Sequence, residues 1–273
     1  MEMIMTKSQV VTTTVYSPIL GIDWNYDAYL PAGYNDSDQQ YPVLFMLHGL
    51  YGNHRNLLER IDSQAILDEL IETTGQALIV IFVDGFNSFY INARHGMAME
   101  DAVMHDLVPA MLSRYRIQPG ASNHAIGGIS MGGYGAARFA LRYPDVFAHA
   151  ALISPAIWEH VASEWPLRQQ LHPFTDGCQN WSDRIYNALL PIHDIHHGRG
   201  AVDFYVATSA GDQTVPVHDI RDFVTVLQQV GIPTVYVQDQ DYDHGWDYWR
   251  EAVPPAYHWV LKKVGQRHAA LAH

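Results

Sequence analysis

The chain has 273 residues, of which 48% are hydrophobic and 16% charged, and its formal net charge is -13. This size and apolar content suffice for one substantial core, and we expect a single domain over residues 1–273. A strongly negative surface repels phosphate backbones and argues against nucleic-acid binding. The single cysteine, Cys178, excludes an intrachain disulfide and fits a reducing compartment.

Neither the N-terminal residues nor the apolar runs of the sequence predict a signal peptide or a membrane-spanning helix. Residues 1–10 contain Glu2 and lack the apolar core and the cleavage site of a signal peptide. The longest strongly apolar run, 77–83, is far shorter than the roughly 20 residues of a membrane-spanning helix. We therefore expect a soluble, cytoplasmic protein.

Strand and helix patterns alternate along the chain. Strands are predicted at 10–16, 24–30, 42–47, 77–83, 124–127, 146–153, 202–208 and 234–238. Helices are predicted from apolar spacing at 60–72, 99–115, 132–142, 217–230 and 247–263. This alternation is typical of an α/β fold with a mostly parallel central sheet and helices on both faces. The first two strands have no helix between them and are expected to pair antiparallel.

One stretch interrupts the alternation. Residues from about 155 to 200 contain no clear buried strand but are rich in Trp, His and Pro. We interpret them as a cap-like insertion above the sheet. Because the insertion follows a strand end, its aromatic residues Trp158, Trp165 and Trp181 are candidates for an acyl-binding wall, although they are equally well explained as packing within the insertion.

The sharpest local signal is Gly128-Ile129-Ser130-Met131-Gly132, a G-x-S-x-G sequence. It follows an apolar strand and begins a helix, which is the setting of a nucleophile elbow. Glycines on both sides permit a tight turn, and the helix N-terminus favours developing negative charge near Ser130. The alternative is a glycine-rich packing turn with no chemical role.

A serine nucleophile needs a base and an acid that orients the base. In proteins with an elbow of this kind, the three residues follow the chain order Ser, acid, His. Among the histidines beyond the strand at 202–208, only His244 falls in a loop between the last strand and the last helix. Asp212 follows the strand at 202–208 and is our choice of acid, with a turn-forming role as the alternative. Asp243 is a substitute candidate.

A tetrahedral intermediate requires two backbone N–H donors for its oxyanion. The residue after the nucleophile, Met131, supplies one. The second is expected from the loop His48-Gly49-Leu50-Tyr51-Gly52, where glycines allow the backbone to approach the substrate, and Leu50 is our choice.

With these motifs in place, the sequence resembles the esterase D-like family of α/β-hydrolases, in particular tributyrin esterases. The resemblance extends over nearly the whole chain, including residues 29–34, Leu47-His48-Gly49, the run GISMGGYG at 128–135, Gly211-Asp212 and His244 with Trp246 and Trp249. It implies an α/β-hydrolase fold, Ser130, Asp212 and His244 as triad, Leu50 and Met131 as oxyanion donors, and short-chain acyl esters as substrates.

The histidine motif departs from the family pattern. Similar esterases often have Gly-His-Asp-Trp, whereas this chain has Asp243-His244-Gly245-Trp246. The exchange leaves open which aspartate orients His244. A second histidine cluster, His-Asp-Ile-His-His at 193–197, has no spacing of a known closed metal site, so we read it as a polar loop and expect no metal and no cofactor.

The sequence thus predicts a serine carboxylesterase acting on small-molecule esters, with no nucleic-acid or membrane partner and with homo-oligomerisation left open. Acyl transfer by the same triad is the alternative, as is hydrolysis of S-formylglutathione, feruloyl or acetyl-sugar esters. A binding module that retains the fold is disfavoured by the presence of all three catalytic residue types. A catalytic role for Cys178 is not expected, because no strand leads into its turn-like segment.

Overall fold

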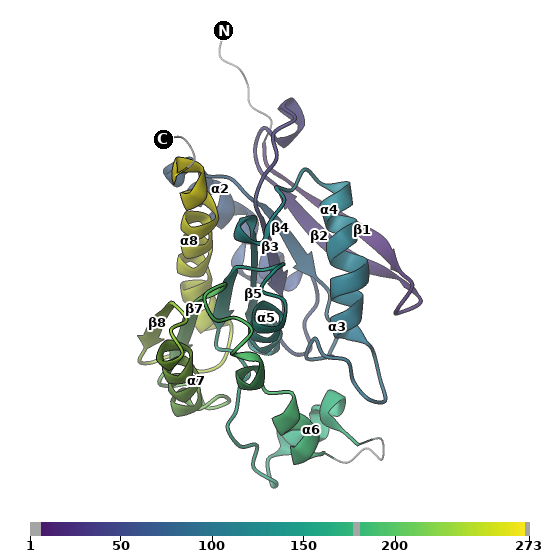
Figure 1. The fold of residues 1–273 in the computed structure, drawn as a ribbon, viewed down its shortest axis with the longest axis vertical. Coiled ribbons are helices and arrows are strands. Elements are labelled where there is room, and N and C mark those ends of the chain that lie inside the picture. The colour runs from purple at the N-terminus through teal and green to yellow at the C-terminus, as the bar shows by residue number, and fades with distance from the viewer. Residues whose placement is uncertain (1–6, 177–180, 271–273) are drawn as a thin grey trace.

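The computed structural model describes residues 7–176 and 181–270, so Cys178 lies outside the described residues. Eight strands form one sheet in the order β1-β2-β4-β3-β5-β6-β7-β8 (Figure 1). The strands are β1 Gln9–Ser17, β2 Ile22–Leu30, β3 Val43–Leu47, β4 Ile79–Val83, β5 His124–Ile129, β6 His149–Ile153, β7 Asp203–Ser209 and β8 Thr234–Asp239. The pairs β1–β2 and β2–β4 are antiparallel and all others are parallel, which confirms the mostly parallel sheet and the antiparallel first pair that the sequence predicted.

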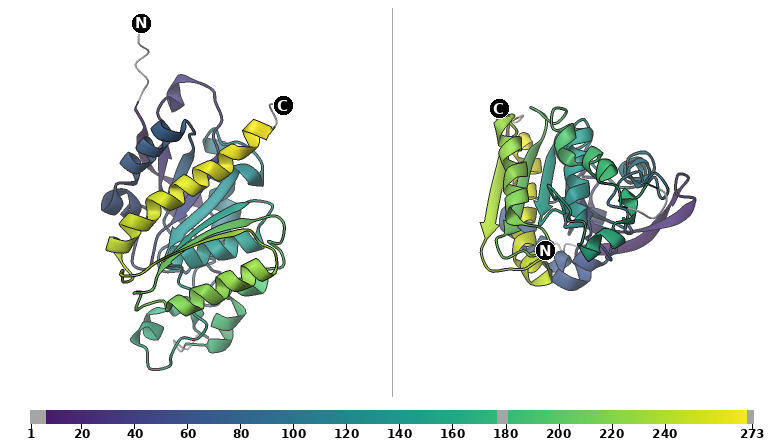
Figure 2. Two further views of the ribbon diagram at one scale, coloured as in Figure 1. Left: turned by 90° about the vertical axis from the view of Figure 1, so that its left-hand side faces the viewer. Right: turned by 90° about the horizontal axis from the view of Figure 1, so that it is seen from below.

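Helices cover both faces of this sheet (Figure 2). They are α1 Asn56–Ile61, α2 Ser63–Thr74, α3 Met99–Asp101, α4 Val108–Arg114, α5 Met131–Arg142, α6 Asp183–Ala188, α7 Val217–Gln229 and α8 Trp246–Ala270. Apolar side chains of α1, α2 and α8 pack in one core cluster, whereas those of α4, α5 and α7 pack in the other. Strand β3 shows why its apolar run is continuous: Val43, Phe45 and Leu47 enter one cluster while Leu44 and Met46 enter the other.

Three predicted elements differ from the structure for a local reason that the backbone shows. The single helix predicted at 60–72 is two helices, because Asp62 adopts φ 54° between α1 and α2 and its side chain accepts from Ala65 N–H. The helix predicted at 99–115 contains a π-helical segment, Ala102–Leu107, between α3 and α4. The strand predicted at 146–153 begins at His149, since Val146 and Phe147 donate to the Tyr143 carbonyl in a turn.

The segment between β6 and β7 contains α6 and three 3-10 turns, Pro166–Gln170, His172–Phe174 and Pro191–Asp194. Two further 3-10 turns lie at Tyr34–Asp36 and Ala121–Asn123. Figure 1 shows α6 beyond the end of the sheet, at the opposite end of the molecule from the two termini. Because the segment leaves from the end of β6, it occupies the carboxyl-end side of the parallel strands, where ligands bind in open α/β sheets.

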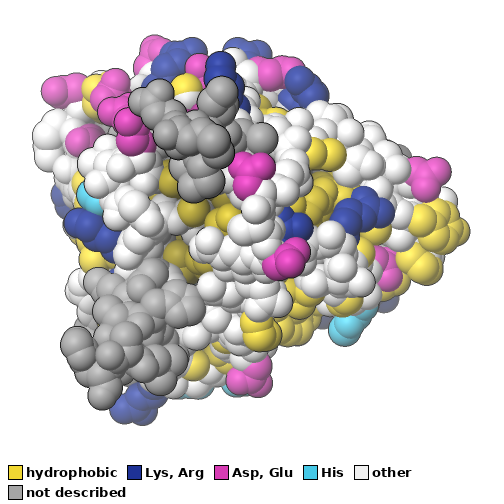
Figure 3. Space-filling view, turned by 90° about the horizontal axis from the view of Figure 1, so that it is seen from above, with side chains coloured by type: hydrophobic (Ala, Val, Ile, Leu, Met, Phe, Trp, Pro, Cys, Tyr) yellow, Lys and Arg dark blue, Asp and Glu magenta, His cyan; other side chains and the backbone are white. Residues whose placement is uncertain are grey.

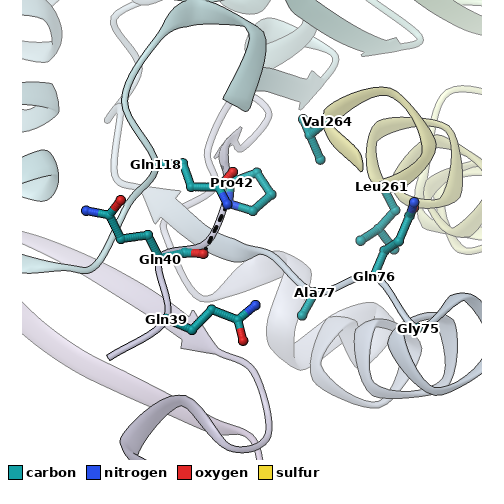
Figure 4. A pocket seen from close by; sticks show the side chains of 9 residues that line it. All are labelled: Gln39, Gln40, Pro42, Gly75, Gln76, Ala77, Gln118, Leu261 and Val264. Carbon is teal, nitrogen blue, oxygen red and sulfur yellow. Dashed lines mark hydrogen bonds between the residues drawn. The ribbon is translucent and has the colours of Figure 1, made fainter. Parts of the chain in front are cut away.

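A cavity of about 260 Å³ lies at the other end of the sheet (Figure 4). It is bordered by residues that precede β3, β4 and β5, namely Pro42, Ala77 and Gln118, and by Leu261 and Val264 of α8. Figure 3 views the molecule from this end and shows apolar side chains between scattered acidic and basic ones. None of the helices in the described part of the chain combines the length and apolar character needed to cross a bilayer.

Candidate active site

Ser130 occupies a sharp turn between β5 and α5. Its backbone has φ 53° and ψ -117°, a conformation that a non-glycine residue adopts only under constraint. A Cβ on Gly128 would lie 2.3 Å from the Gly132 carbonyl carbon, and one on Gly132 would lie 2.2 Å from the Leu47 oxygen. The two glycines are therefore steric requirements of this turn, which presents Ser130 at the carboxyl end of β5 and the N-terminus of α5.

A chain of hydrogen bonds joins Ser130 to two other loops. The Ser130 hydroxyl lies 2.8 Å from His244 Nε2, and His244 Nδ1 lies 2.7 Å from Asp212 Oδ2. The carboxylate beside Nδ1 places the imidazole proton there, so that Nε2 is the acceptor for the Ser130 hydroxyl. The other carboxylate oxygen, Asp212 Oδ1, accepts from Thr214 N–H at 2.9 Å and Val215 N–H at 2.7 Å, which fixes the plane of the acid.

The structure distinguishes the two aspartates that the sequence left open. Asp212 is 5% exposed and contacts the imidazole directly. Asp243 Oδ1 instead accepts from two backbone groups, Gln213 N–H at 2.9 Å and His244 N–H at 2.7 Å. These two hydrogen bonds lower the pKa of the exposed Asp243 carboxyl below its ordinary value. Asp212 is thus the aspartate with the geometry of an imidazole-orienting acid.

The loop after β3 lies beside the turn that holds Ser130. A Cβ on Gly49 would lie 3.4 Å from Ser130 Cβ. The Gly49 carbonyl oxygen accepts from His48 Nδ1 at 2.7 Å and from Gly52 N–H at 3.0 Å. In a trans peptide the C=O and the following N–H point in opposite directions, so the Leu50 N–H points away from these donors. Met131 is the first residue of α5, where a backbone N–H has no partner within the helix.

His48 and Asp84 support this loop and were not singled out by the sequence analysis. Gly85 N–H donates to His48 Nε2 at 2.9 Å, which leaves the proton on Nδ1 for the Gly49 carbonyl. Burial raises the pKa of Asp84, but hydrogen bonds from His54 and from the Phe86 N–H outweigh burial and hold that pKa well below its ordinary value. Their positions directly after β3 and β4 were the signal that could have identified them.

The three tryptophans of the insertion belong to one aromatic cluster. Trp158 packs against Trp165 with ring centroids 5.6 Å apart, and Phe174 packs against Trp181 at 5.7 Å. Trp158 is 2% exposed, and its indole N–H donates to the Thr214 carbonyl at 2.8 Å, two residues from Asp212. Packing within the insertion therefore explains these contacts, while the Trp158 hydrogen bond connects the cluster to the acid loop.

Buried polar contacts fasten the insertion to α5. Arg138 donates to the Leu189 carbonyl at 2.5 Å and to Glu100 at 3.0 Å, and the Tyr134 hydroxyl donates to the same Leu189 carbonyl at 2.6 Å. Arg142 pairs with Glu100 at 2.7 Å and with Asp194 at 3.4 Å. Helix α5, which begins directly after Ser130, is thereby tied to the segment between β6 and β7.

The histidine cluster at 193–197 has no metal-like geometry. His193, His196 and His197 are exposed, and Asp194 is engaged by Arg142. Among the residues that the structure describes, no three His, Cys, Asp or Glu side chains are grouped so as to hold a metal ion.

The mostly parallel sheet with helices on both faces and a nucleophile elbow after β5 defines an α/β-hydrolase. The chain belongs to the putative esterase family, whose model matches residues 17–260. An acetyl esterase of Caldicellulosiruptor saccharolyticus is 26% identical, with 93% of this chain and 98% of that protein covered.

Solved structures show the same fold. A ferulic acid esterase superposes with a TM-score of 0.81 at 22% identity, covering 95% of this chain and 100% of that one. An S-formylglutathione hydrolase of Staphylococcus aureus superposes with a TM-score of 0.74 at 21% identity, covering 94% and 97%. The protein is therefore an enzyme of the ester-hydrolase class, and small-molecule esters are its substrates.

Proposed function

We propose that the protein is a serine carboxylesterase that cleaves short-chain acyl esters through an acyl-enzyme on Ser130. The observation that carries the proposal is the hydrogen-bonded series from Ser130 Oγ through His244 to Asp212, at 2.8 Å and 2.7 Å. A serine hydroxyl becomes an effective nucleophile when a neighbouring imidazole accepts its proton and a carboxylate stabilises the imidazolium that forms.

The first half of the reaction makes the acyl-enzyme. Ser130 Oγ attacks the ester carbonyl carbon while its proton passes to His244 Nε2. The carbonyl oxygen becomes an oxyanion that accepts hydrogen bonds from the Leu50 and Met131 N–H groups. Collapse of this intermediate breaks the bond to the alcohol oxygen, which leaves with the proton from His244 Nε2.

The second half returns the free enzyme. Water attacks the acyl carbon, gives its proton to His244 Nε2, and the second tetrahedral intermediate expels Ser130 Oγ, which takes that proton back. The products are the carboxylic acid and the regenerated serine. If an alcohol takes the place of water, the same steps form a new ester, which is the acyl-transfer alternative.

The preference for short acyl groups rests on the insertion. In our proposal Trp158, Trp165 and Trp181 form the aromatic side of a confined acyl pocket, and the contacts of Arg138 with Leu189 hold that side in place. Each added methylene is favourable only until it meets a wall. We therefore expect turnover to peak between acetyl and butyryl esters and to be lost at about C10.

Flat aromatic acyl groups are a second candidate substrate class. The aromatic cluster of the insertion favours this candidate, because aromatic rings stack on one another at low cost. The likeness to a ferulic acid esterase agrees with it. A feruloyl ester is accordingly part of the substrate test.

The cellular setting is part of the same proposal. A cytoplasmic enzyme fits a chain with one cysteine. The net charge of -13 disfavours nucleic acid and anionic membrane surfaces as partners. Sedimentation of the purified protein would show whether it forms a homo-oligomer.

The decisive test is an ester panel with a serine variant. p-Nitrophenyl esters from acetyl to decanoyl, a feruloyl ester and S-formylglutathione are assayed with wild type, Ser130→Ala and the control Ser37→Ala, which alters an exposed serine of a loop. Wild type and the control should cleave short esters equally, and Ser130→Ala should lose several orders of magnitude in kcat. Turnover by Ser130→Ala comparable to wild type would refute the mechanism. Added alcohols that divert product to a new ester would show acyl transfer.

A further inference from the structure

The acid and the base lie on two separate loops that approach each other closely. Asp212 follows β7 and His244 follows β8, two adjacent parallel strands. A Cβ on Gly211 would lie 2.7 Å from the Tyr242 carbonyl oxygen, so the loops meet at van der Waals distance. The 2.7 Å contact between His244 and Asp212 therefore depends on what holds one loop against the other.

Two side-chain acceptors bridge these loops. Ser209 Oγ accepts from Gly211 N–H at 3.3 Å and from Tyr242 N–H at 3.1 Å, at the base of the loops. Asp243 Oδ1 accepts from Gln213 N–H and His244 N–H, at 2.9 Å and 2.7 Å, at their outer end. The Asp243 bridge is the nearer one to the reacting groups. Its two donors are the N–H of Gln213, the residue after the acid, and the N–H of the base, His244.

The Asp243 bridge has charged character. A carboxylate that accepts two backbone N–H groups forms charge-assisted hydrogen bonds, which are stronger than neutral ones. The same two bonds lower the pKa of Asp243, so the group is ionised wherever the enzyme works at neutral pH. Its side chain is exposed, and the hydrogen bonds of the His244 imidazole go to Asp212 and Ser130 instead.

We propose that Asp243 is a positioning residue that sets the His244 base against the Asp212 acid by bonding both loop backbones through one carboxylate oxygen. The inference rests on the proposed esterase function. The bridging residue directly precedes the base in the run Asp243-His244-Gly245-Trp246.

The test compares three variants. Asp243→Ala removes the acceptor, Asp243→Asn keeps an amide oxygen at the same place without the charge, and Asp241→Ala removes an exposed carboxylate of the same loop that bridges nothing. We measure kcat and KM on a short-chain p-nitrophenyl ester and the rate of Ser130 labelling by a fluorophosphonate. Circular dichroism and thermal unfolding show that each variant is folded.

The bridge predicts a drop in kcat with KM unchanged, because misplacing a catalytic group costs rate more than substrate binding. We expect Asp243→Ala to lose about tenfold in kcat and in labelling rate, with KM within about twofold. Asp243→Asn should recover to within about threefold of wild type, and Asp241→Ala should equal wild type.

Failure of the inference and failure of the proposed function give different results. If wild type cleaves esters and Asp243→Ala keeps the wild-type kcat, the positioning role is wrong and the esterase function stands. If Asp243→Asn is as impaired as Asp243→Ala, the acceptor bridge is overturned in favour of a purely electrostatic effect. If wild type neither cleaves esters nor reacts with the fluorophosphonate, the proposed function itself is refuted.

Discussion

Replacement of His48 tests how the Leu50 N–H, the proposed oxyanion donor, is held. The Nδ1–H of His48 and the Gly52 N–H together fix the Gly49 carbonyl, and through the planar peptide they fix the Leu50 N–H. His48→Ala removes one of these two restraints. Complete removal of one oxyanion donor costs about 10²–10³ in kcat, so loss of half its support should cost about 10- to 30-fold.

Two conservative variants separate the two hydrogen bonds of the imidazole. In His48→Asn the amide nitrogen falls near the place of Nδ1 and still donates to the Gly49 carbonyl. In His48→Gln the longer side chain places its amide near Nε2, where the oxygen accepts from Gly85 N–H but the Gly49 carbonyl loses its donor. Asparagine should therefore keep kcat within about threefold of wild type, while glutamine should lose as much as alanine.

The assay is steady-state kinetics on a short-chain ester beside thermal unfolding. All three variants lose at least one buried hydrogen bond, so each is expected to be destabilised by about 1–3 kcal/mol. Stability therefore does not separate them, but kcat does. If His48→Asn and His48→Gln have equal kcat, or if His48→Ala keeps the wild-type kcat, the peptide-plane argument is wrong.

Three further outcomes follow from the site. Activity should fall on acidification, since protonated His244 has no acceptor for the Ser130 proton; a flat pH–rate profile into the acid range would argue against a histidine base. EDTA should leave turnover unchanged, because the proposed mechanism needs no Lewis acid. A loss of turnover that an added metal ion restores would point to a metal site at residues 193–197. Arg138→Met should loosen the insertion and raise the decanoate-to-butyrate rate ratio several-fold, whereas the control Arg221→Met, which alters an exposed arginine of α7 bonded to Gln238, should not. An unchanged ratio in Arg138→Met would mean that the insertion does not limit acyl length.

The central strands could be predicted because a strand buried on both faces has a continuous run of apolar residues. The runs at 43–47 and 79–83 are continuously apolar, and both form strands that contact two core clusters. The elbow was equally visible, since its glycines are steric requirements of the turn. The fold class and the position of the candidate nucleophile could thus be predicted from sequence pattern.

Other features of the fold and the site could not be predicted, because they depend on local backbone conformation or on contacts between residues far apart in the sequence. The break between α1 and α2 arises from a left-handed Asp62, a conformation that leaves no periodic signal. The hydrogen bond from Gly85 N–H to His48 joins the ends of β3 and β4 across 37 residues of sequence. The sequence also offered two aspartates for one role, and only the bond from His244 Nδ1 to Asp212 distinguished them.

Identification of the covalently modified residue tests the central claim most directly. Wild type and Ser130→Ala are treated with a fluorophosphonate, and the adduct is located by mass spectrometry of the digested protein. The account predicts one adduct per chain, on Ser130, with ester turnover lost in proportion to labelling and no adduct in Ser130→Ala. An adduct on another residue, or full turnover by fully labelled enzyme, would contradict it.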